Sequence, residues 1–381
     1  MKVAVIADDL TGAAEIGGIG LRYGLKVEIA KTVDPDTKAD MVVIDTDARS
    51  ITQAEAVAKV SEVSHALKAL HPQLWYKKID SVMRGHVLAE IKAQCEAMQL
   101  QKTLVVPANP ALGRTLVGGH YYVHGEPLHS TSFGYDPEFP VTDAHVASRF
   151  NNEVIVQSYT EPLPSTGVVV GEAATMDDID KWTHHMQNDV LLAGAAAFFT
   201  ACMDQSFGEK TVNDTEPAAL RSPILYVSGS TFEQSAQLIS QLHADKGLVC
   251  YMPAALMHNH GDTNTDLLQE WTSEVAVMLQ QHGKAVMAIP QTGEEIYSAK
   301  QLRIQMALAV KAVFDQMIVR ELVIEGGSTA AAILEELNIN SIFPTQELTA
   351  GVIRNAAPTY PDLHITLKPG SYKWSNEVWA F

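Results

Sequence analysis

The sequence predicts an α/β protein made of two α/β lobes with largely parallel sheets. Short runs rich in β-branched residues alternate with longer segments of helical periodicity, which is the pattern of strands joined by crossover helices. This alternation stops in a polar, turn-rich stretch at residues 204–223 and then begins again. The length of 381 residues allows two or three domains. We therefore divide the chain into residues 1–215 and 216–381, and we expect a ligand-binding cleft between the two lobes.

The regular elements of the first lobe are predicted by short apolar runs and by helical periodicity. Thr52 and Glu55 fit a capping box, which predicts that a helix opens there. Val87–Met98 has the spacing of a second helix. The predicted strands are Val3–Ala7, Val27–Ala30, Met41–Ile44, Leu74–Ile79, Leu104–Val106 and Val168–Val170.

The later part of the first lobe is less regular. Periodicity fails from Asn109 to Pro140, so we expect a long functional loop there, with a β-hairpin across Tyr121–Glu126 as the alternative. The apolar run over Val190–Phe199 predicts a strand-like segment. The second α/β series then starts at Ile224–Val227.

The composition excludes several classes of partner. Hydrophobic residues make up 46% of the chain and charged residues 19%, which is a globular profile. Lys and Arg total 27 against 45 Asp and Glu, so the formal net charge is −18. A protein this acidic has no overall field that attracts nucleic acid or an anionic membrane, and we predict neither as a partner. A local group of arginines and helix N-termini can still bind a small anion.

Cysteine usage and the N-terminus predict a cytoplasmic protein. Cys95, Cys202 and Cys250 lie far apart without a C-x-x-C pair, so neither a disulfide framework nor a structural zinc site is supported. The apolar run Val3–Ala7 is too short for the apolar region of a signal peptide. The most apolar run elsewhere, near Val190–Met203, is short of the ~18 residues of a spanning helix.

Two adjacent carboxylates, Asp8 and Asp9, follow the first predicted strand and precede a helix. In an open α/β sheet ligands bind at the carboxyl ends of strands, so this pair is placed to bind substrate hydroxyls or a metal, or to abstract a proton. The alternative is that one of them only caps the helix.

A second polar cluster stands where another strand passes into the helix at Val87. It supplies a cation, a carboxylate, a hydroxyl and a bidentate carboxylate binder within one turn region, and this set suits an anionic polyol. A surface network of ion pairs is the alternative. Two further arginines, Arg49 and Arg114, follow strands that should end at the same sheet edge. The residues of the cluster are Lys78, Asp80, Ser81 and Arg84.

In the second lobe, small residues follow two predicted strands and precede helices. They are Ser228-Gly229-Ser230 and Gly326-Gly327-Ser328-Thr329, and Gly370 follows the last strand. Small residues at such junctions let main-chain N–H groups approach a phosphate. Neither segment matches a P-loop or a dinucleotide fingerprint. Together they indicate a nucleotide site made of loops.

The order and spacing of these segments resembles the four-carbon acid sugar kinase family, which includes D-threonate, D-erythronate and 3-oxo-tetronate kinases. The resemblance covers nearly the whole chain. Its motifs here are Ala7-Asp8-Asp9-Leu10-Thr11-Gly12-Ala13, Lys78-Ile79-Asp80-Ser81 to Arg84-Gly85, Pro107-Ala108 to Gly113-Arg114-Thr115, Gly118-Gly119, Asp136-Pro137 to Pro140-Val141-Thr142, Ser228-Gly229-Ser230, Gly326-Gly327-Ser328-Thr329-Ala330 and Lys368-Pro369-Gly370.

The resemblance implies an acid-sugar-binding domain at residues 1–215 and a nucleotide-binding domain at 216–381, with the γ-phosphate of ATP passed to the terminal hydroxyl of a tetronate-like acid. Mg²⁺ and a carboxylate that takes the hydroxyl proton complete this chemistry, and Asp80 or Asp9 is the candidate base. By residue match, the sugar acid would be held by Asp9, Arg49, Asp80, Ser81 and Arg84, and the positions of Lys78 and Arg114 after strands add these two residues to the site. The nucleotide would be held by Ser228, Ser230, Gly326, Gly327, Ser328, Thr329 and Gly370.

The chain departs from the family pattern at two places. The family often has Gly-Gly-Asp-Thr where this chain has Ser328, and Lys-Ser-Gly-Asn where it has Pro369 and Ser371. A catalytically inactive sugar-acid sensor is therefore the alternative function, although Ser228-Gly229-Ser230 and Gly370 favour the kinase. The partners we expect are the sugar acid and ATP. A homo-oligomer is compatible with the sequence, and no metal ligands are identified.

Overall fold

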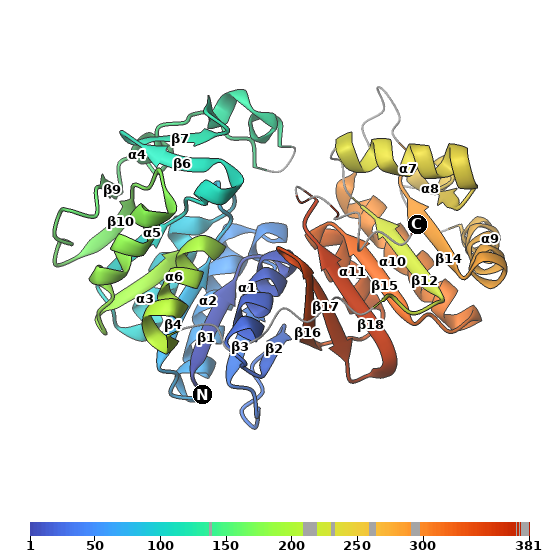
Figure 1. Cartoon of the computed structure of the whole chain (residues 1–381), viewed down its shortest axis with the longest axis horizontal. Helices are drawn as coiled ribbons and strands as arrows, with labels where there is room; N and C mark the ends of the chain where they lie inside the picture. The colour runs from blue at the N-terminus through green and yellow to red at the C-terminus, as the bar shows by residue number, and fades with distance from the viewer. Residues whose placement is uncertain are drawn as a thin grey trace. The chain divides into compact units, whose positions relative to one another are not determined.

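The computed structural model describes residues 1–136, 139–208, 219–229, 233–258, 264–290, 298–370, 372, 374 and 381. The chain separates into two compact units, Met1–Asn213 and Asp214–Phe381. Each unit is an α/β body with its own sheet, so the predicted fold class is confirmed (Figure 1).

The first unit is built on a parallel sheet in the order β2-β3-β1-β4-β11-β5-β10-β9. The strands predicted from apolar runs are all present, with ends shifted by at most two residues. The bounds are β1 Val3–Ala7, β2 Val27–Ala30, β3 Met41–Asp45, β4 Leu74–Lys78, β5 Lys102–Val106, β9 Val154–Gln157, β10 Gly167–Gly171 and β11 Val190–Gly194.

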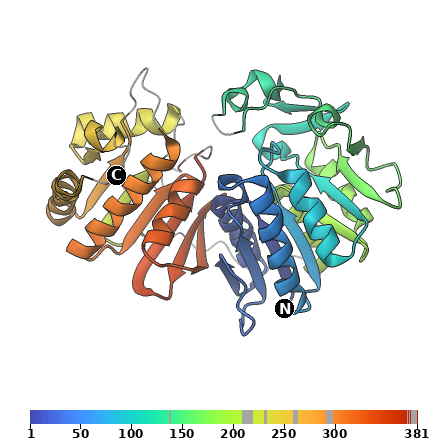
Figure 2. The same ribbon diagram turned by 180° about the vertical axis from the view of Figure 1, so that it is seen from behind.

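Helices cover both faces of this sheet. α1 contacts α6 on one face, and α2 packs on α3 on the other (Figures 1 and 2). The capping box of Thr52 and Glu55 is confirmed at the start of α2. The bounds are α1 Leu10–Arg22, α2 Gln53–Lys68, α3 Val87–Met98, α4 Val146–Arg149, α5 Met176–Trp182 and α6 Ala196–Phe207, with short 3₁₀ helices η1 Ala48–Ser50 and η5 Thr183–His185.

The expected long loop at Asn109–Pro140 contains structure of its own. It forms a small antiparallel sheet of β6 Arg114–Val117, β7 His120–Val123 and β8 Glu126–Pro127. The hairpin alternative is therefore correct, because β7 and β8 are joined by a turn in which His124 and Gly125 both have positive φ. Short 3₁₀ helices flank it: η2 Pro110–Leu112, η3 Leu128–Ser130 and η4 Ser132–Tyr135.

The prediction of a strand-like segment over Val190–Phe199 is wrong for the second half of that range. The strand ends at Gly194, and residues from Ala196 onward form α6. The run is apolar throughout because both the strand and this part of the helix are buried, and periodicity cannot separate two buried elements. α6 continues to Phe207, so the start of the expected linker is helical.

The second unit has a mixed sheet in the order β13-β14-β12-β15-β18-β17-β16. In this sheet β13, β14, β12, β15 and β18 are parallel to their neighbours in that order. The next two strands, β17 and β16, are antiparallel. The bounds are β12 Ile224–Ser228, β13 Val249–Tyr251, β14 Lys284–Ala288, β15 Glu321–Glu325, β16 Ser341–Thr349, β17 Val352–Ala357 and β18 Tyr360–Lys368.

The helices of the second unit bury the parallel strands. α9, α10 and α11 form a packed row (Figure 2). α7 packs through Ile239 and Leu242 on a cluster that contains Tyr226, Val286 and Val323. The bounds are α7 Glu233–Lys246, α8 Ala254–Met257, α9 Thr265–His282, α10 Ala299–Gln316 and α11 Gly327–Glu336. Within the described ranges, no helix is long and apolar enough to cross a membrane.

Candidate active site

Three neighbouring strands of the first unit end at the same edge. β1 pairs in parallel with β3 and with β4, with Ala7 opposite Asp45 on one side and opposite Lys78 on the other. Because the strands are parallel and in register, the loops after them leave the sheet together. The segments that meet in this way are 8–9, 45–49 and 78–84.

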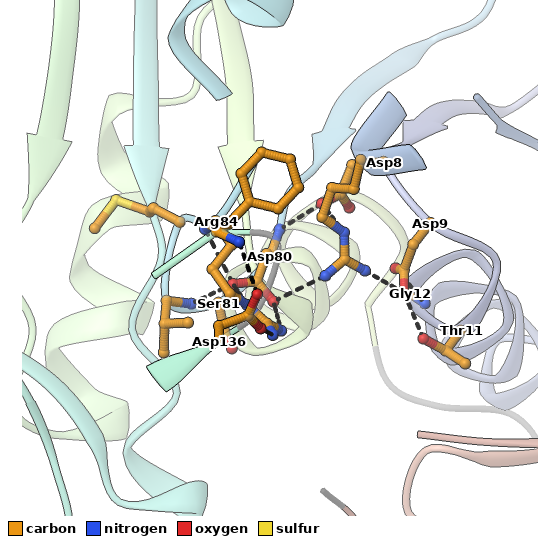
Figure 3. Close-up of polar contacts among 12 residues, drawn as sticks. Asp8, Asp9, Thr11, Gly12, Asp80, Ser81, Arg84 and Asp136 are labelled. Carbon is orange, nitrogen blue, oxygen red and sulfur yellow. Dashed lines mark hydrogen bonds and ion pairs between the residues drawn. The ribbon is translucent and has the colours of Figure 1, made fainter. Parts of the chain in front are cut away.

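Asp9 caps the helix that follows β1. Its Oδ1 accepts the N–H of Gly12 at 2.9 Å, and its Oδ2 accepts the hydroxyl of Thr11 at 2.5 Å (Figure 3). A Cβ at position 12 would lie 2.6 Å from Asp9 Oδ1 and 2.9 Å from Nζ of Lys78. Glycine is therefore needed for the helix start, the carboxylate and the ammonium to approach one another. Asp9 is therefore the N-cap of α1, and the cap leaves its carboxylate at the positive end of this helix.

The guanidinium of Arg49 joins the three loops. Its Nε lies 3.2 Å from Asp8 Oδ2, its Nη1 lies 3.6 Å from Asp80 Oδ1, and its Nη2 pairs with Asp9. Asp8 Oδ2 also accepts the main-chain N–H of Asp80 at 3.1 Å. Each nitrogen of Arg49 thus faces a different carboxylate, so this residue fixes the arrangement of all three.

Arg84 is held by two further carboxylate contacts. Its Nε and Nη2 donate to the two oxygens of Asp80 at 3.1 and 2.7 Å, and its Nη1 donates to Asp136 Oδ2 at 2.8 Å (Figure 3). Asp80 Oδ2 also accepts the main-chain N–H groups of Val82 and Arg84. The pair is therefore bidentate, and it closes the turn between β4 and α3.

The three aspartates of this cluster differ in proton affinity. Burial raises the pKa of Asp8 to about 6, and the positive charge of Arg49 only partly opposes it. Burial also acts on Asp9, but Arg49 and Lys78 outweigh it and lower its pKa. For Asp80 burial is again opposed, here by Arg84 and Arg49, which hold its pKa far below the usual range. At neutral pH Asp9 and Asp80 are therefore anions.

A fourth carboxyl group, Asp45, stands at the end of β3. It is 2% exposed, its Oδ1 accepts the N–H of Asp47 at 3.0 Å, and its buried Oδ2 has no hydrogen-bond partner among the described residues. Burial, followed by the charge of Asp47, raises its pKa to about 8. Asp45 is therefore protonated at neutral pH.

Ser81 and Arg114 meet beside this cluster. Arg114, at the start of β6, donates through Nη1 to Ser81 Oγ. The ring of Phe133 lies 5.1 Å from Cζ of Arg84 and 5.6 Å from Cζ of Arg114. The hydroxyl of Tyr121 donates to the carbonyl of Ser81 at 2.6 Å. The small sheet and its flanking 3₁₀ helices therefore support the arginine side of the cluster.

Lys78 lies beneath the cluster. Its side chain is 6% exposed, its Nζ donates to the carbonyl of Ile79 at 3.0 Å, and it lies 3.8 Å from Glu15. The same ammonium contributes to the low pKa of Asp9. We find Lys78 under the carboxylates, where it supplies positive charge to them.

In the second unit, the three segments with small residues also end neighbouring strands. Ser228 on β12 is opposite Glu325 on β15, which is opposite Lys368 on β18. A Cβ at Gly229 would lie 1.9 Å from Oγ1 of Thr329. Glycine at this position therefore lets the loop after β12 lie directly on the start of α11.

The loop between β15 and α11 exposes the start of a helix. Gly326 has φ 108°, and its N–H donates to the carbonyl of Lys368 at 3.1 Å. The first main-chain bond of the helix runs from Ala330 to Gly326, so the N–H groups of residues 327–329 meet no acceptor within the part of the chain that the structure describes. Such N–H groups suit a phosphate. The turn needs its positive φ at Gly326 and not at Gly327.

A buried cluster lies directly under this loop. Glu325 and Lys368 are almost fully buried and lie 3.1 Å apart. The hydroxyls of Tyr226 and Ser235 both donate to Glu325. Lys368 also donates to the carbonyl of Pro369 at 3.2 Å. One ion pair therefore ties the end of β15 to the end of β18 and fixes the two loops relative to each other.

These two units match known domain families. A sugar-binding N-terminal domain matches residues 3–202, and a nucleotide-binding C-terminal domain matches residues 225–372. The chain belongs to the four-carbon acid sugar kinase family. The resemblance seen in the sequence motifs is thereby confirmed.

Its relatives in this family carry several substrate names. The D-threonate kinase of Salmonella typhimurium is 27% identical over 372 residues, which cover 93% of this chain and 85% of that protein. The D-erythronate kinase of Heliobacterium modesticaldum is 32% identical over 208 residues, 48% of this chain and 47% of that protein. The 3-oxo-tetronate kinase of Pseudomonas fluorescens is 24% identical over 415 residues, 96% of this chain and 93% of that protein.

Two crystal structures share the fold. One, from Salmonella typhimurium and named provisionally as a tRNA synthase, has a TM-score of 0.78 at 18% identity and covers 100% of both chains. The other, from Haemophilus influenzae, has a TM-score of 0.71 at 18% identity and covers 98% of both chains. At this identity the likeness concerns the fold alone.

The structure groups most of the predicted site residues. The sugar-side residues converge at one sheet edge, and Ser228, Gly326–Thr329 and Gly370 follow adjacent strands of the second unit. Ser230 lies outside the described residues. Sequence reasoning assigned no role to Asp45, Asp136 or Phe133. Asp45 follows a predicted strand, and Asp136 stands in one of the family motifs, so the sequence contains a signal for both. Nothing in the sequence marks Phe133.

The described residues provide no complete protein site for Mg²⁺. They contain no group of three His, Cys, Asp or Glu side chains that could hold a metal ion. Both oxygens of Glu325, the carboxylate nearest the phosphate loop, are bound by Tyr226, Ser235 and Lys368. In nucleotide sites Mg²⁺ is commonly held by phosphate oxygens and water with only one or two carboxylates.

Proposed function

We propose that the protein transfers the γ-phosphoryl group of ATP to the terminal hydroxyl of a four-carbon acid sugar of the threonate, erythronate or 3-oxo-tetronate type. The observation that carries this proposal is the convergence of paired arginines and aspartates at one sheet edge of the unit that matches the sugar-binding domain. The exposed helix start in the unit that matches the nucleotide-binding domain supports it. Mg²⁺ would enter with the nucleotide and neutralise phosphate charge.

The transfer forms a bond between the terminal oxygen and the γ-phosphorus and breaks the bond from that phosphorus to the β–γ bridging oxygen. ADP leaves, and the hydroxyl proton passes to a carboxylate. We propose Asp9 as the acceptor of this proton, because its side chain is 14% exposed whereas that of Asp8 is 2% exposed. Asp80, held by two guanidinium groups, is a poor proton acceptor and acts as a positioning residue.

In the second unit, we propose that phosphate groups bind the main-chain N–H groups of residues 327–329. This assignment needs no particular side chain at position 328, so Ser328 in place of the family's Asp is compatible with nucleotide binding. No observation favours the sensor alternative.

A coupled assay of ADP release tests the proposal. Purified protein is incubated with MgATP and, separately, D-threonate, D-erythronate and a 3-oxo-tetronate, with a neutral four-carbon polyol as control. We expect ADP release that depends on at least one of the acids. Calorimetric binding of an acid without ADP release in any mixture would instead identify a sensor, and the kinase proposal would then be wrong.

A further inference from the structure

The arginines of the sugar-side cluster are not equivalent. All three nitrogen groups of Arg49 face carboxylates of the protein, and so do those of Arg84. Protein carboxylates within 4 Å of every nitrogen already compensate the charge of these two guanidinium groups. A substrate carboxylate placed beside either residue would also meet the negative charges of Asp9 and Asp80.

Arg114 differs in its partners. Its side chain donates to the hydroxyl of Ser81 and stacks on Phe133, and among the described residues it has no carboxylate partner. It is half-buried, so part of its surface remains accessible. Among the described residues, its partners are a neutral hydroxyl and an aromatic ring, so none of them compensates the positive charge of Arg114.

The guanidinium of Arg114 is also held in a defined place. Its Cζ lies 5.6 Å from the ring centroid of Phe133, and Cζ of Arg84 lies 5.1 Å from the same centroid. Its hydrogen-bond partner Ser81 is fixed by Tyr121, whose hydroxyl donates to the carbonyl of Ser81 at 2.6 Å. An arginine immobilised before binding loses little further side-chain freedom when a ligand arrives.

A second arginine, Arg149, also lacks a carboxylate partner among the described residues, but it is used differently. Its Nη2 donates to the carbonyls of Val82 and Met83 at 3.1 and 3.0 Å, and its Nη1 is buried from solvent. Arg149 therefore holds the main chain of the turn, and a ligand has no access to its buried edge.

We propose that Arg114 binds the carboxylate of the substrate and is the residue that makes the site select an acid over a neutral sugar. This inference rests on the proposed function, and it gives the arginines separate tasks. Arg49 and Arg84 position the aspartates that contact the hydroxyl end, and Arg114 with Ser81 receives the acid end.

The test compares Arg114→Gln and Arg114→Lys with wild type on two substrates, a four-carbon acid and the corresponding neutral polyol. A charge-assisted hydrogen bond of this kind corresponds to roughly a 10- to 100-fold effect. We expect kcat/KM for the acid to fall by about that factor in Arg114→Gln. The kcat/KM for the polyol and the KM for ATP should stay unchanged. Arg114→Lys should lie between, because it keeps the charge and loses the planar fork. Arg320→Gln, an exposed arginine of the second unit, is the control.

The outcomes separate this inference from the proposed function. If wild type phosphorylates an acid and its preference for acid over polyol survives in Arg114→Gln, the inference is wrong and the kinase stands. If wild type phosphorylates no acid, calorimetric titration of the acid decides: binding that Arg114→Gln weakens supports the inference, and unchanged or undetectable binding overturns it. If Arg114→Gln does not fold, Arg114→Lys alone must show the selective loss.

Discussion

Replacing Asp45 by Asn should make the first unit more stable at alkaline pH. Asp45 is buried at the end of β3, and its Oδ2 has no hydrogen-bond partner among the described residues. Asn keeps an oxygen that can accept the N–H of Asp47, so the local hydrogen bond is retained. The substitution removes the ability to ionise and places an amide NH2 group at the position of Oδ2, and the effect of that group does not depend on pH.

The magnitude follows from the pKa of Asp45, which burial and the charge of Asp47 raise from 3.8 to about 8. A group with a raised acid pKa stabilises the fold fully below pH 3.8, and this stability is lost as the pH rises to about 8. At about 1.4 kcal/mol per pKa unit the upper limit is roughly 6 kcal/mol. Water penetration and local rearrangement reduce such costs, and we expect about 2–3 kcal/mol.

The assay is urea unfolding of wild type and Asp45→Asn at several values between about pH 5 and pH 8.5. We expect the two free energies of unfolding to separate steadily as the pH rises, with the variant the more stable at the alkaline end. If the units unfold in separate transitions, only that of the first unit should respond. Asp36→Asn, at an exposed position, should follow wild type throughout.

Free energies of wild type and Asp45→Asn that stay parallel over this range would refute the reasoning. Such a result would mean that Asp45 ionises in the folded protein at its ordinary pKa, either because water reaches Oδ2 or because a nearby cation compensates it. The same separation in Asp36→Asn would assign the effect to net charge and not to burial.

Three further predictions concern the two sites. Asp9→Asn should keep the cap of α1 and lower kcat by ~10²–10⁴-fold, because Asn caps a helix as well as Asp does but cannot take a proton. A near-normal kcat in a steady-state assay would show that Asp9 is not the base. Lys368→Met should destabilise the second unit by about 3–5 kcal/mol, and adding Glu325→Gln should restore part of this loss in a double-mutant cycle, because the single change leaves a buried charge unpaired. Gly326→Ala should weaken MgATP binding measured by calorimetry while tetronate binding persists, because φ 108° strains any residue with a Cβ.

The fold was largely predictable because its strands are short, apolar and bounded by polar turns. In a parallel sheet both faces are buried, so a strand such as Val3–Ala7 appears as a continuous apolar run. The same property caused the error at Val190–Phe199, where a buried strand passes into a buried helix with only Ala195 between them. At residues 109–140 the sequence predicted only the hairpin of β7 and β8, as an alternative to a loop, and it missed β6 because strands this short carry little periodic signal.

The composition of the site was predictable, but its internal pairing was not. Residues that follow parallel strands must meet at one edge, so the convergence of Asp9, Arg49 and Asp80 follows from strand positions alone. Which arginine contacts which carboxylate depends on side-chain distances across three loops. Phe133 comes from a segment about 50 residues further along the chain than Arg84, and no local pattern connects the two.

The pairing explains how an acidic protein can prepare a site for an anion. Two arginines placed without partners would repel each other and would not hold one geometry, and here Asp8, Asp9, Asp80 and Asp136 neutralise them in the folded chain. Arg114, which has no carboxylate partner among the described residues, is then the cation that remains for an anionic substrate. An anionic substrate gains most from the cation that the protein itself has not compensated, so selectivity for acids and rigidity of the aspartates can reside in different arginines.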